Sequence, residues 1–180
     1  LLFLRPTGYL TGCLLCRYYT KLLMHTVNKY QRQEHAIIAT DVVIFTVKDN
    51  DLKILLIKTT KKEYAGRWAL TGGLIQGTES LEDAAWRHLK NKTGISHPYI
   101  EQLATFGSPT RDPFGRVVSV AYIALIPFDR HELKTTNEYA DINWFSTTDL
   151  PKLAYDHEEI TLSAIARLQA KLAYTNIAQG

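Results

Sequence analysis

From residue 36 onward the chain alternates short apolar runs, rich in β-branched residues, with polar stretches. Such runs between turns are typical of strands. We predict six strands, over residues 36–47, 52–57, 67–70, 99–106, 116–126 and 141–145. Their order, interrupted by two amphipathic segments, predicts an α+β fold with helices packed on a mixed sheet.

The two amphipathic segments, residues 80–92 and 156–173, repeat their apolar residues every three or four positions. This spacing predicts helices. Ser80 followed by Asp83 fits a capping box at the start of the first helix, and Asp156 starts the second helix in the same way.

Polar segments between these elements predict turns and loops. Residues 48–51 are charged and polar, and they join the first two strands into a hairpin. Residues 71–73 read Thr-Gly-Gly, which we interpret as a turn because glycine allows tight backbone conformations. Residues 61–66 and 107–115 are expected to be loops.

Composition and charge exclude several classes of protein. Of the 180 residues, 46% are hydrophobic and 22% are charged, which rules out a disordered, collagen-like or coiled-coil chain. The net charge of +3 comes from 21 Lys and Arg against 18 Asp and Glu. Three of the basic residues and no acid lie in residues 1–23, so the rest of the chain carries 18 of each sign. The charge therefore gives no indication of a nucleic-acid partner.

The first 23 residues also contain both cysteines, Cys13 and Cys16, and the single methionine, Met24, follows directly. We expect the native start at Met24, with residues 1–23 as upstream or non-native sequence; the alternative is a targeting peptide or membrane anchor. The longest uncharged run, residues 6–16, is too short to span a bilayer. The cysteine pair has no second pair or histidine cluster that would indicate a metal site. We expect a cytoplasmic protein without a membrane partner.

Residues 73–95 carry the most informative motif, GLIQGTESLEDAAWRHLKNKTGI. This stretch resembles the Nudix box, G-x5-E-x7-R-E-U-x-E-E-x-G-U, in which U is a bulky apolar residue. Six positions match: Gly73, Glu79, Arg87, Leu89, Gly94 and Ile95. The resemblance implies a Nudix fold, an α/β/α sandwich with a mixed sheet between helices. It makes residues 34–174 a Nudix-like domain, residues 1–33 an N-terminal extension and residues 175–180 a tail.

The motif departs from the family where the family holds metal. The glutamates of R-E-U-x-E-E bind divalent ions, which neutralise a pyrophosphate and orient a water. Here those positions are His88, Asn91 and Lys92, on a helix face that no other acid of the helix reaches. We therefore expect no metal ion and no confident catalytic residue. Glu79 and Arg87 remain, and we expect them to pair and fix the loop before the helix.

Three further segments, residues 102–107, 111–122 and 153–160, resemble the Nudix-like domain of NrtR-type regulators of NAD metabolism and of ADP-ribose-linked relatives. In those regulators the domain senses ADP-ribose or related metabolites, and a following winged helix-turn-helix binds operator DNA. Many members have a degenerate box and bind without hydrolysis. The resemblance implies a homodimer, with DNA as a partner only if a winged-helix domain follows Gly180.

Candidate ligand-binding residues come from arginines and glycines near the motif. Guanidinium groups suit diphosphate oxygens, and backbone amides before a helix favour anions. The candidates are Arg67, Gly72, Gly73, Arg111, Asp112 and Arg116. Two alternatives stay open: Asp112 pairs with an arginine and closes the 111–116 turn, and Arg67 is a solvated strand end.

The aromatic residues divide into two groups. We expect the tryptophans to be core residues rather than platforms for a base: Trp68, Trp86 and Trp144. Three others are candidates for stacking: Tyr64, Phe114 and Tyr155. The neighbours Asp156 and His157 resemble a catalytic pair, but the helix cap accounts for Asp156 and no nucleophile motif accompanies them.

Our leading interpretation is a domain that binds ADP-ribose or a related NAD-derived nucleotide, inactive or nearly so, and requiring no cofactor for binding. The alternative is a hydrolase that cleaves ADP-ribose or another nucleoside diphosphate derivative with Mg²⁺. It would need carboxylates from outside the motif, such as Glu63, Glu101 or Asp112. A third interpretation is a scaffold domain that acts through dimerisation.

Overall fold

The computed structural model describes residues 35–128, 133 and 139–177 of the chain. The expectations for residues 1–33, including a start at Met24, and for the last residues of the tail, 178–180, lie outside the described residues. Within the described residues, no helix has the length and apolar character that crossing a membrane requires.

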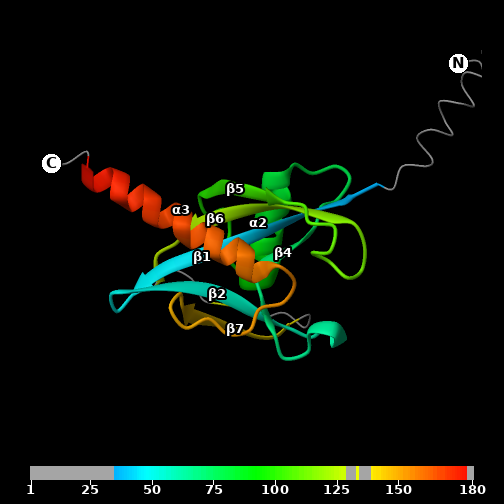
Figure 1. Cartoon of the computed structure of the whole chain (residues 1–180), viewed down its shortest axis with the longest axis horizontal. Helices are drawn as coiled ribbons and strands as arrows, with labels where there is room; N and C mark the ends of the chain where they lie inside the picture. The colour runs from blue at the N-terminus through cyan, green and yellow to red at the C-terminus, as the bar shows by residue number, and fades with distance from the viewer. Residues whose placement is uncertain (1–34, 129–132, 134–138, 178–180) are drawn as a thin grey trace, which may run out of the picture. The chain divides into compact units, whose positions relative to one another are not determined.

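The described residues form seven strands, two α-helices and one short 3-10 helix (Figure 1). The strands are β1 (Ile37–Lys48), β2 (Asp51–Thr59), β3 (Trp68–Ala69), β4 (Thr71–Leu74), β5 (Ile100–Phe106), β6 (Val117–Leu125) and β7 (Tyr139–Ser146). The helices are η1 (Lys62–Tyr64), a short 3-10 helix, α2 (Leu81–Thr93) and α3 (His157–Ile177). All six predicted strands and both predicted α-helices are present, with boundaries shifted by a few residues.

The predicted hairpin of β1 and β2 closes at Asp49 and Asn50, whose φ angles are 55° and 59°. Two consecutive left-handed residues form the type I′ turn that matches the twist of antiparallel strands. Asn and Asp tolerate this conformation better than most residues. The turn sets the register in which Lys48 lies opposite Asp51.

The sheet is mixed, and β1 lies at its centre. One edge of β1 pairs in parallel with β6, which in turn pairs with β5. The other edge is shared, because β2 pairs with residues 45–48 and β4 with residues 39–42. β1 and β2 therefore diverge beyond the hairpin, with β4 along β1 and β3 along β2.

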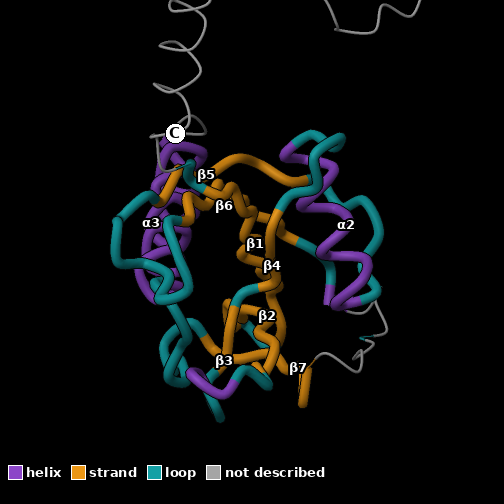
Figure 2. Tube along the Cα trace, turned by 90° about the vertical axis from the view of Figure 1, so that its right-hand side faces the viewer, coloured by secondary structure: helices purple, strands orange, loops and turns teal. Residues whose placement is uncertain are grey.

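Helices cover both faces of the sheet, with α2 on one side and α3 on the other (Figure 2). The alternation of side chains along β1 divides its apolar residues between the two faces. Val42 and Ile44 belong to the cluster that contains Leu89 of α2. Val43 and Phe45 belong to the cluster that contains Ile160 and Ala164 of α3. The predicted α+β class and α/β/α sandwich are confirmed.

The prediction of a turn at residues 71–73 was wrong, because this segment is strand β4. Gly72 lies so close to β1 that a Cβ atom on it would be 2.1 Å from Asp41 Oδ1 and 2.3 Å from the Thr40 carbonyl oxygen. Glycine is required here for close approach of two strands rather than for a tight turn. This contact between distant segments is invisible in the local sequence.

Gly72→Ala should therefore lower the free energy of unfolding, by about 1–3 kcal/mol, because the added methyl group has no space without a backbone shift. Gly77→Ala is the matched control, since a Cβ atom at Gly77 meets nothing within 4 Å. Urea unfolding measures both. Equal unfolding midpoints for the two variants would contradict the close approach of β4 to β1.

Candidate functional site

A cavity of about 160 Å³ lies where β1 and β2 diverge. Its walls come from β1 to β4, the segment after β2, the last turn of α2, the loop between β5 and β6, the first residues of β6 and β7, and the residues around the start of α3. The polar and charged side chains on these walls are Asp41, Thr59, Lys61, Lys92, Arg111, Asp112, Tyr139, Tyr155 and His157.

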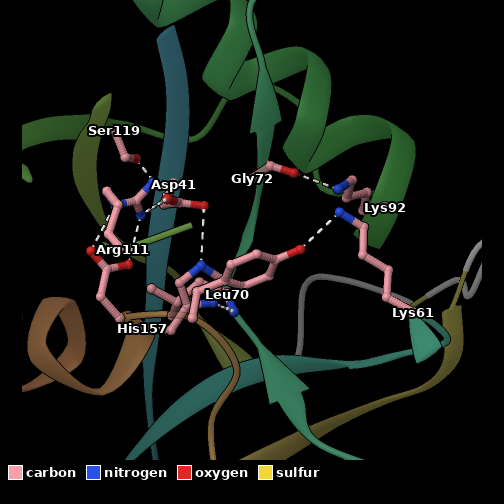
Figure 3. A network of polar contacts seen from close by, with 10 residues as sticks. Asp41, Lys61, Leu70, Gly72, Lys92, Arg111, Ser119 and His157 are labelled. Atoms are coloured by element: carbon pink, nitrogen blue, oxygen red, sulfur yellow. Dashed lines mark hydrogen bonds and ion pairs between the residues drawn. The ribbon is translucent and has the colours of Figure 1, made fainter. Parts of the chain in front are cut away.

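Arg111 lines the cavity, and its guanidinium group lies between two carboxylates (Figure 3). Its Nε and Nη2 atoms donate to the two Asp156 oxygens, both at 2.7 Å. Nη2 is also 3.4 Å from Asp41 Oδ2, which accepts a 2.6 Å hydrogen bond from Ser119 Oγ. The Arg111 side chain is only 3% exposed. Burial alone would lower its pKa, but the two carboxylates raise it.

His157 completes this network. The Leu70 N–H donates to Nδ1 at 2.9 Å, so the neutral ring carries its proton on Nε2, 3.7 Å from Asp41 Oδ1. Burial lowers the pKa of His157, although Asp41 opposes this shift, and keeps the ring neutral. Because Nδ1 is occupied by a backbone donor, His157 is not placed to act as a general base. Asp156 binds Arg111 rather than His157, which removes the apparent catalytic pair.

Glu79 and Arg87, which match the Nudix box, have the geometry that the sequence predicted. Arg87 Nε and Nη2 donate to the two carboxylate oxygens of Glu79 at 2.8 and 2.5 Å. This hydrogen bonding lowers the pKa of Glu79 to about 2. The predicted cap also forms, with the Asp83 N–H donating to Ser80 Oγ at 3.0 Å. These contacts fix the loop between β4 and α2.

Two of the three substituted positions of the box, His88 and Lys92, have side chains that contact β4. His88 is buried, and its Nε2 lies 3.1 Å from the Leu74 carbonyl oxygen. Burial, together with the nearby charges of Lys92 and Arg87, lowers the pKa of His88. Lys92 Nζ donates to the Gly72 carbonyl oxygen (Figure 3). Asn91, the third substituted position, is exposed.

These residues do not fit the Mg²⁺ ion that the Nudix box implies. Mg²⁺ is bound through carboxylate and phosphate oxygens, whereas the two substituted box positions that contact β4 hold a neutral imidazole and an ammonium group. Within the described part of the chain, no group of three His, Cys, Asp or Glu residues is arranged to hold a metal ion.

The acids considered for a metal-dependent alternative are dispersed. Glu101 on β5 pairs with Arg167 and Lys171 of α3, and the η1 residue Glu63 is exposed and not part of the cavity wall. Asp112 does line the cavity, and its Oδ1 accepts the Phe114 N–H at 2.8 Å. The turn is therefore closed by a backbone amide, and Asp112 is not the partner of Arg111.

The structure brings four of the six candidate ligand-binding residues to the cavity wall: Gly72, Gly73, Arg111 and Asp112. Arg116 instead donates to the Gly107 carbonyl oxygen at 2.7 Å, and Arg67 lies 5.6 Å from the centre of the Tyr64 ring. Neither belongs to the wall.

The two glycines of β4 direct their backbone groups differently. The Ile75 N–H donates to the Ile38 carbonyl oxygen, and antiparallel pairs alternate, so the Gly73 N–H faces β1. The same alternation directs the Gly72 backbone groups away from β1. Of the two backbone amides proposed to bind an anion, only the Gly72 N–H points away from β1 and is not used in pairing with that strand.

The tryptophans and the candidate stacking residues have different surroundings. All three tryptophans are partly buried against the two main apolar clusters, as expected for core residues. Tyr155 lines the cavity and its ring lies 4.3 Å from that of Tyr64. Phe114 is 54% exposed, and Lys61 Nζ lies 5.2 Å from its ring centre.

Sequence reasoning missed Asp41, Ser119 and Lys61 as site residues. Asp41 is an acid inside an apolar strand, and a buried acid needs a partner, so it offered a usable signal. Ser119 and Lys61 gave none, because a serine in a strand and a lysine in a charged loop are ordinary features.

Comparison with known proteins agrees with the fold and the motif. The model of the NUDIX domain family matches residues 38–165. The ADPR responsive transcriptional repressor NtrR of Acinetobacter baylyi is 36% identical over 154 residues, which cover 82% of this chain and 61% of that protein. The ADP-ribose pyrophosphatase of Methanocaldococcus jannaschii is 35% identical over 145 residues, covering 80% of this chain and 82% of that protein.

A solved structure is similar as well. The NUDIX domain of Shewanella oneidensis NrtR, crystallised with ADP ribose, is 33% identical with a TM-score of 0.70, covering 81% of this chain and 97% of that one. The resemblance carried by the sequence motifs is confirmed. The chain spans about 61% of the length of the Acinetobacter repressor.

Arg111→Met should lower the free energy of unfolding by about 3–5 kcal/mol, because it leaves the buried Asp41 and the partly buried Asp156 carboxylates without their cation. Arg116→Met is the control: it removes the same charge from an exposed side chain and should cost less than about 1 kcal/mol. Chemical denaturation at pH 7 measures both. Similar losses for the two variants would show that Arg111 is not the structural cation of the site.

Proposed function

The chain belongs to the NUDIX domain family, and on that premise we propose that it binds ADP-ribose or a related NAD-derived nucleotide as a regulatory ligand, with little or no hydrolysis. The relatives of the chain support the ligand class: a repressor responsive to ADPR, a pyrophosphatase of ADP-ribose, and a NUDIX domain crystallised with ADP ribose. The nucleotide would lie at the cavity between the diverging strands β1 and β2.

One observation carries the regulatory half of the proposal. Two of the substituted box positions, His88 and Lys92, contact β4, where a Nudix hydrolase presents carboxylates to its metal ions. Without metal ligands among the described residues, the site lacks the groups with which a Nudix hydrolase lowers the pKa of a water and orients it for attack. The neutral His157, occupied at Nδ1, supplies no substitute base.

The size of the cavity limits what it encloses. At about 160 Å³ it is smaller than the roughly 300–1,000 Å³ of sites that bury a whole drug-sized ligand. It suits the central part of a nucleotide derivative, with the rest of the molecule reaching out past the walls. Tyr155 and the neighbouring Tyr64 offer aromatic surface for such a flanking group.

The remaining parts of the proposal concern the whole protein. We propose a cytoplasmic, homodimeric transcriptional regulator of NAD metabolism. Binding of the regulator to DNA would require a winged-helix domain. The Acinetobacter repressor, of which the matched region covers 61% of the length, supports the role as a transcriptional regulator.

A second candidate function is hydrolysis of ADP-ribose with Mg²⁺. The similarity to the Methanocaldococcus jannaschii pyrophosphatase, which extends over 82% of that enzyme, favours it. The substituted box argues against it, because Lys92 places a cation at a metal position.

We expect isothermal titration calorimetry to detect ADP-ribose binding in the presence of EDTA. We also expect AMP release from ADP-ribose with Mg²⁺ to stay at the level of a protein-free control, with a metal-dependent ADP-ribose pyrophosphatase assayed alongside. Steady AMP release that EDTA abolishes would overturn the regulatory proposal in favour of the hydrolase.

A further inference from the structure

We propose that Lys61 and Lys92 form a two-lysine clamp that holds the diphosphate of the ligand in place of a metal ion. This inference rests on the proposed function, because it assigns the anion-binding groups of the same cavity. It replaces the arginines that the sequence suggested for this role.

Lys92 supplies the first cation. Its position in the box corresponds to a metal-binding glutamate of active Nudix enzymes, and its side chain reaches from α2 to the Gly72 carbonyl oxygen on the cavity wall (Figure 3). The ammonium group also lies 4.7 Å from the centre of the Tyr139 ring. Its contact with the Gly72 carbonyl uses one of the three N–H donors of the ammonium group, and we assign a phosphate oxygen of the ligand to another.

Lys61 supplies the second cation, from the segment that follows β2. Its Nζ donates to the Tyr155 hydroxyl at 2.8 Å and lies 5.2 Å from the centre of the Phe114 ring. Partial burial would lower the pKa of Lys61, but the hydrogen bond to Tyr155 and the charges of Asp112 and Glu63 raise it. The side chain is therefore charged and is oriented by an aromatic wall.

The arginines of the site are unsuited to this task. Arg111 uses Nε and Nη2 to bind Asp156 and Asp41, so only Nη1 could reach a phosphate without breaking these contacts, and moving the whole guanidinium would leave Asp41 and Asp156 unpaired. Arg67 and Arg116 do not belong to the cavity wall. Lys61 and Lys92 are the remaining Lys or Arg side chains on the wall formed by the described residues.

Two cations from different walls match the two charged phosphates of a diphosphate. A monophosphate would present only one such group, so a two-lysine clamp favours ADP-ribose over AMP. The clamp also makes binding independent of divalent metal, because the neutralising charges belong to the protein.

The test measures the affinity of the full chain for ADP-ribose, AMP and inorganic pyrophosphate by calorimetry in EDTA. Lys92→Met and Lys61→Met should each weaken ADP-ribose binding about ten- to hundredfold, the effect of losing a charge-assisted contact. AMP binding should weaken less in at least one of the two variants. Lys90→Met and Lys62→Met are the controls, since they remove the same charge from neighbouring exposed side chains outside the cavity. They should stay within twofold of the unmodified chain.

Thermal unfolding of each variant shows whether it is folded. If Lys92→Met is not folded, Lys92→Arg, which should retain most of the affinity, and Lys61→Met carry the test. ADP-ribose binding that is equal in both Met variants and in the controls would overturn the clamp and leave the proposed function intact. Pyrophosphate binding that depends on both lysines, without any ADP-ribose binding, would support the clamp and overturn the proposed ligand.

Discussion

The buried guanidinium of Arg111 holds together three of the parts of the chain that form the site. It comes from the loop between β5 and β6, and it binds Asp156 before α3 while lying beside Asp41 of β1. Each of these groups would be costly to bury alone, so their positions depend on one another. Because Arg111 binds these carboxylates, we do not assign it to the ligand, although its residue type suggested that role.

The packing around Asp41 and Arg111 also affects β4 and, through it, Lys92. Asp41 can turn toward Arg111 and Ser119 only because Gly72 has no side chain to occupy that space. Gly72 then presents its carbonyl oxygen to Lys92 across the gap between β4 and α2. A chain of contacts thus runs from a structural ion pair to the cation that we assign to the ligand, and it places that cation where the family holds metal.

Features that depend on neighbouring residues were predictable from the sequence. The capping box at Ser80, the Glu79–Arg87 pair and most of the succession of strands and helices along the chain follow from spacing within short segments. Features that depend on distant residues were not. Arg111 meets partners 45 and 70 residues away, and spacing within its own loop could not reveal them. The glycines of residues 71–73 suggested a turn because local sequence cannot show an approaching strand.

A crystal structure of the chain with ADP-ribose, grown in EDTA, tests the central claim most directly. The account predicts that phosphate oxygens lie within hydrogen-bond distance, about 3 Å, of both Lys61 Nζ and Lys92 Nζ, while Arg111 keeps its bonds to Asp156. A diphosphate bound by Arg111 or Arg116, with both lysines directed elsewhere, would contradict it.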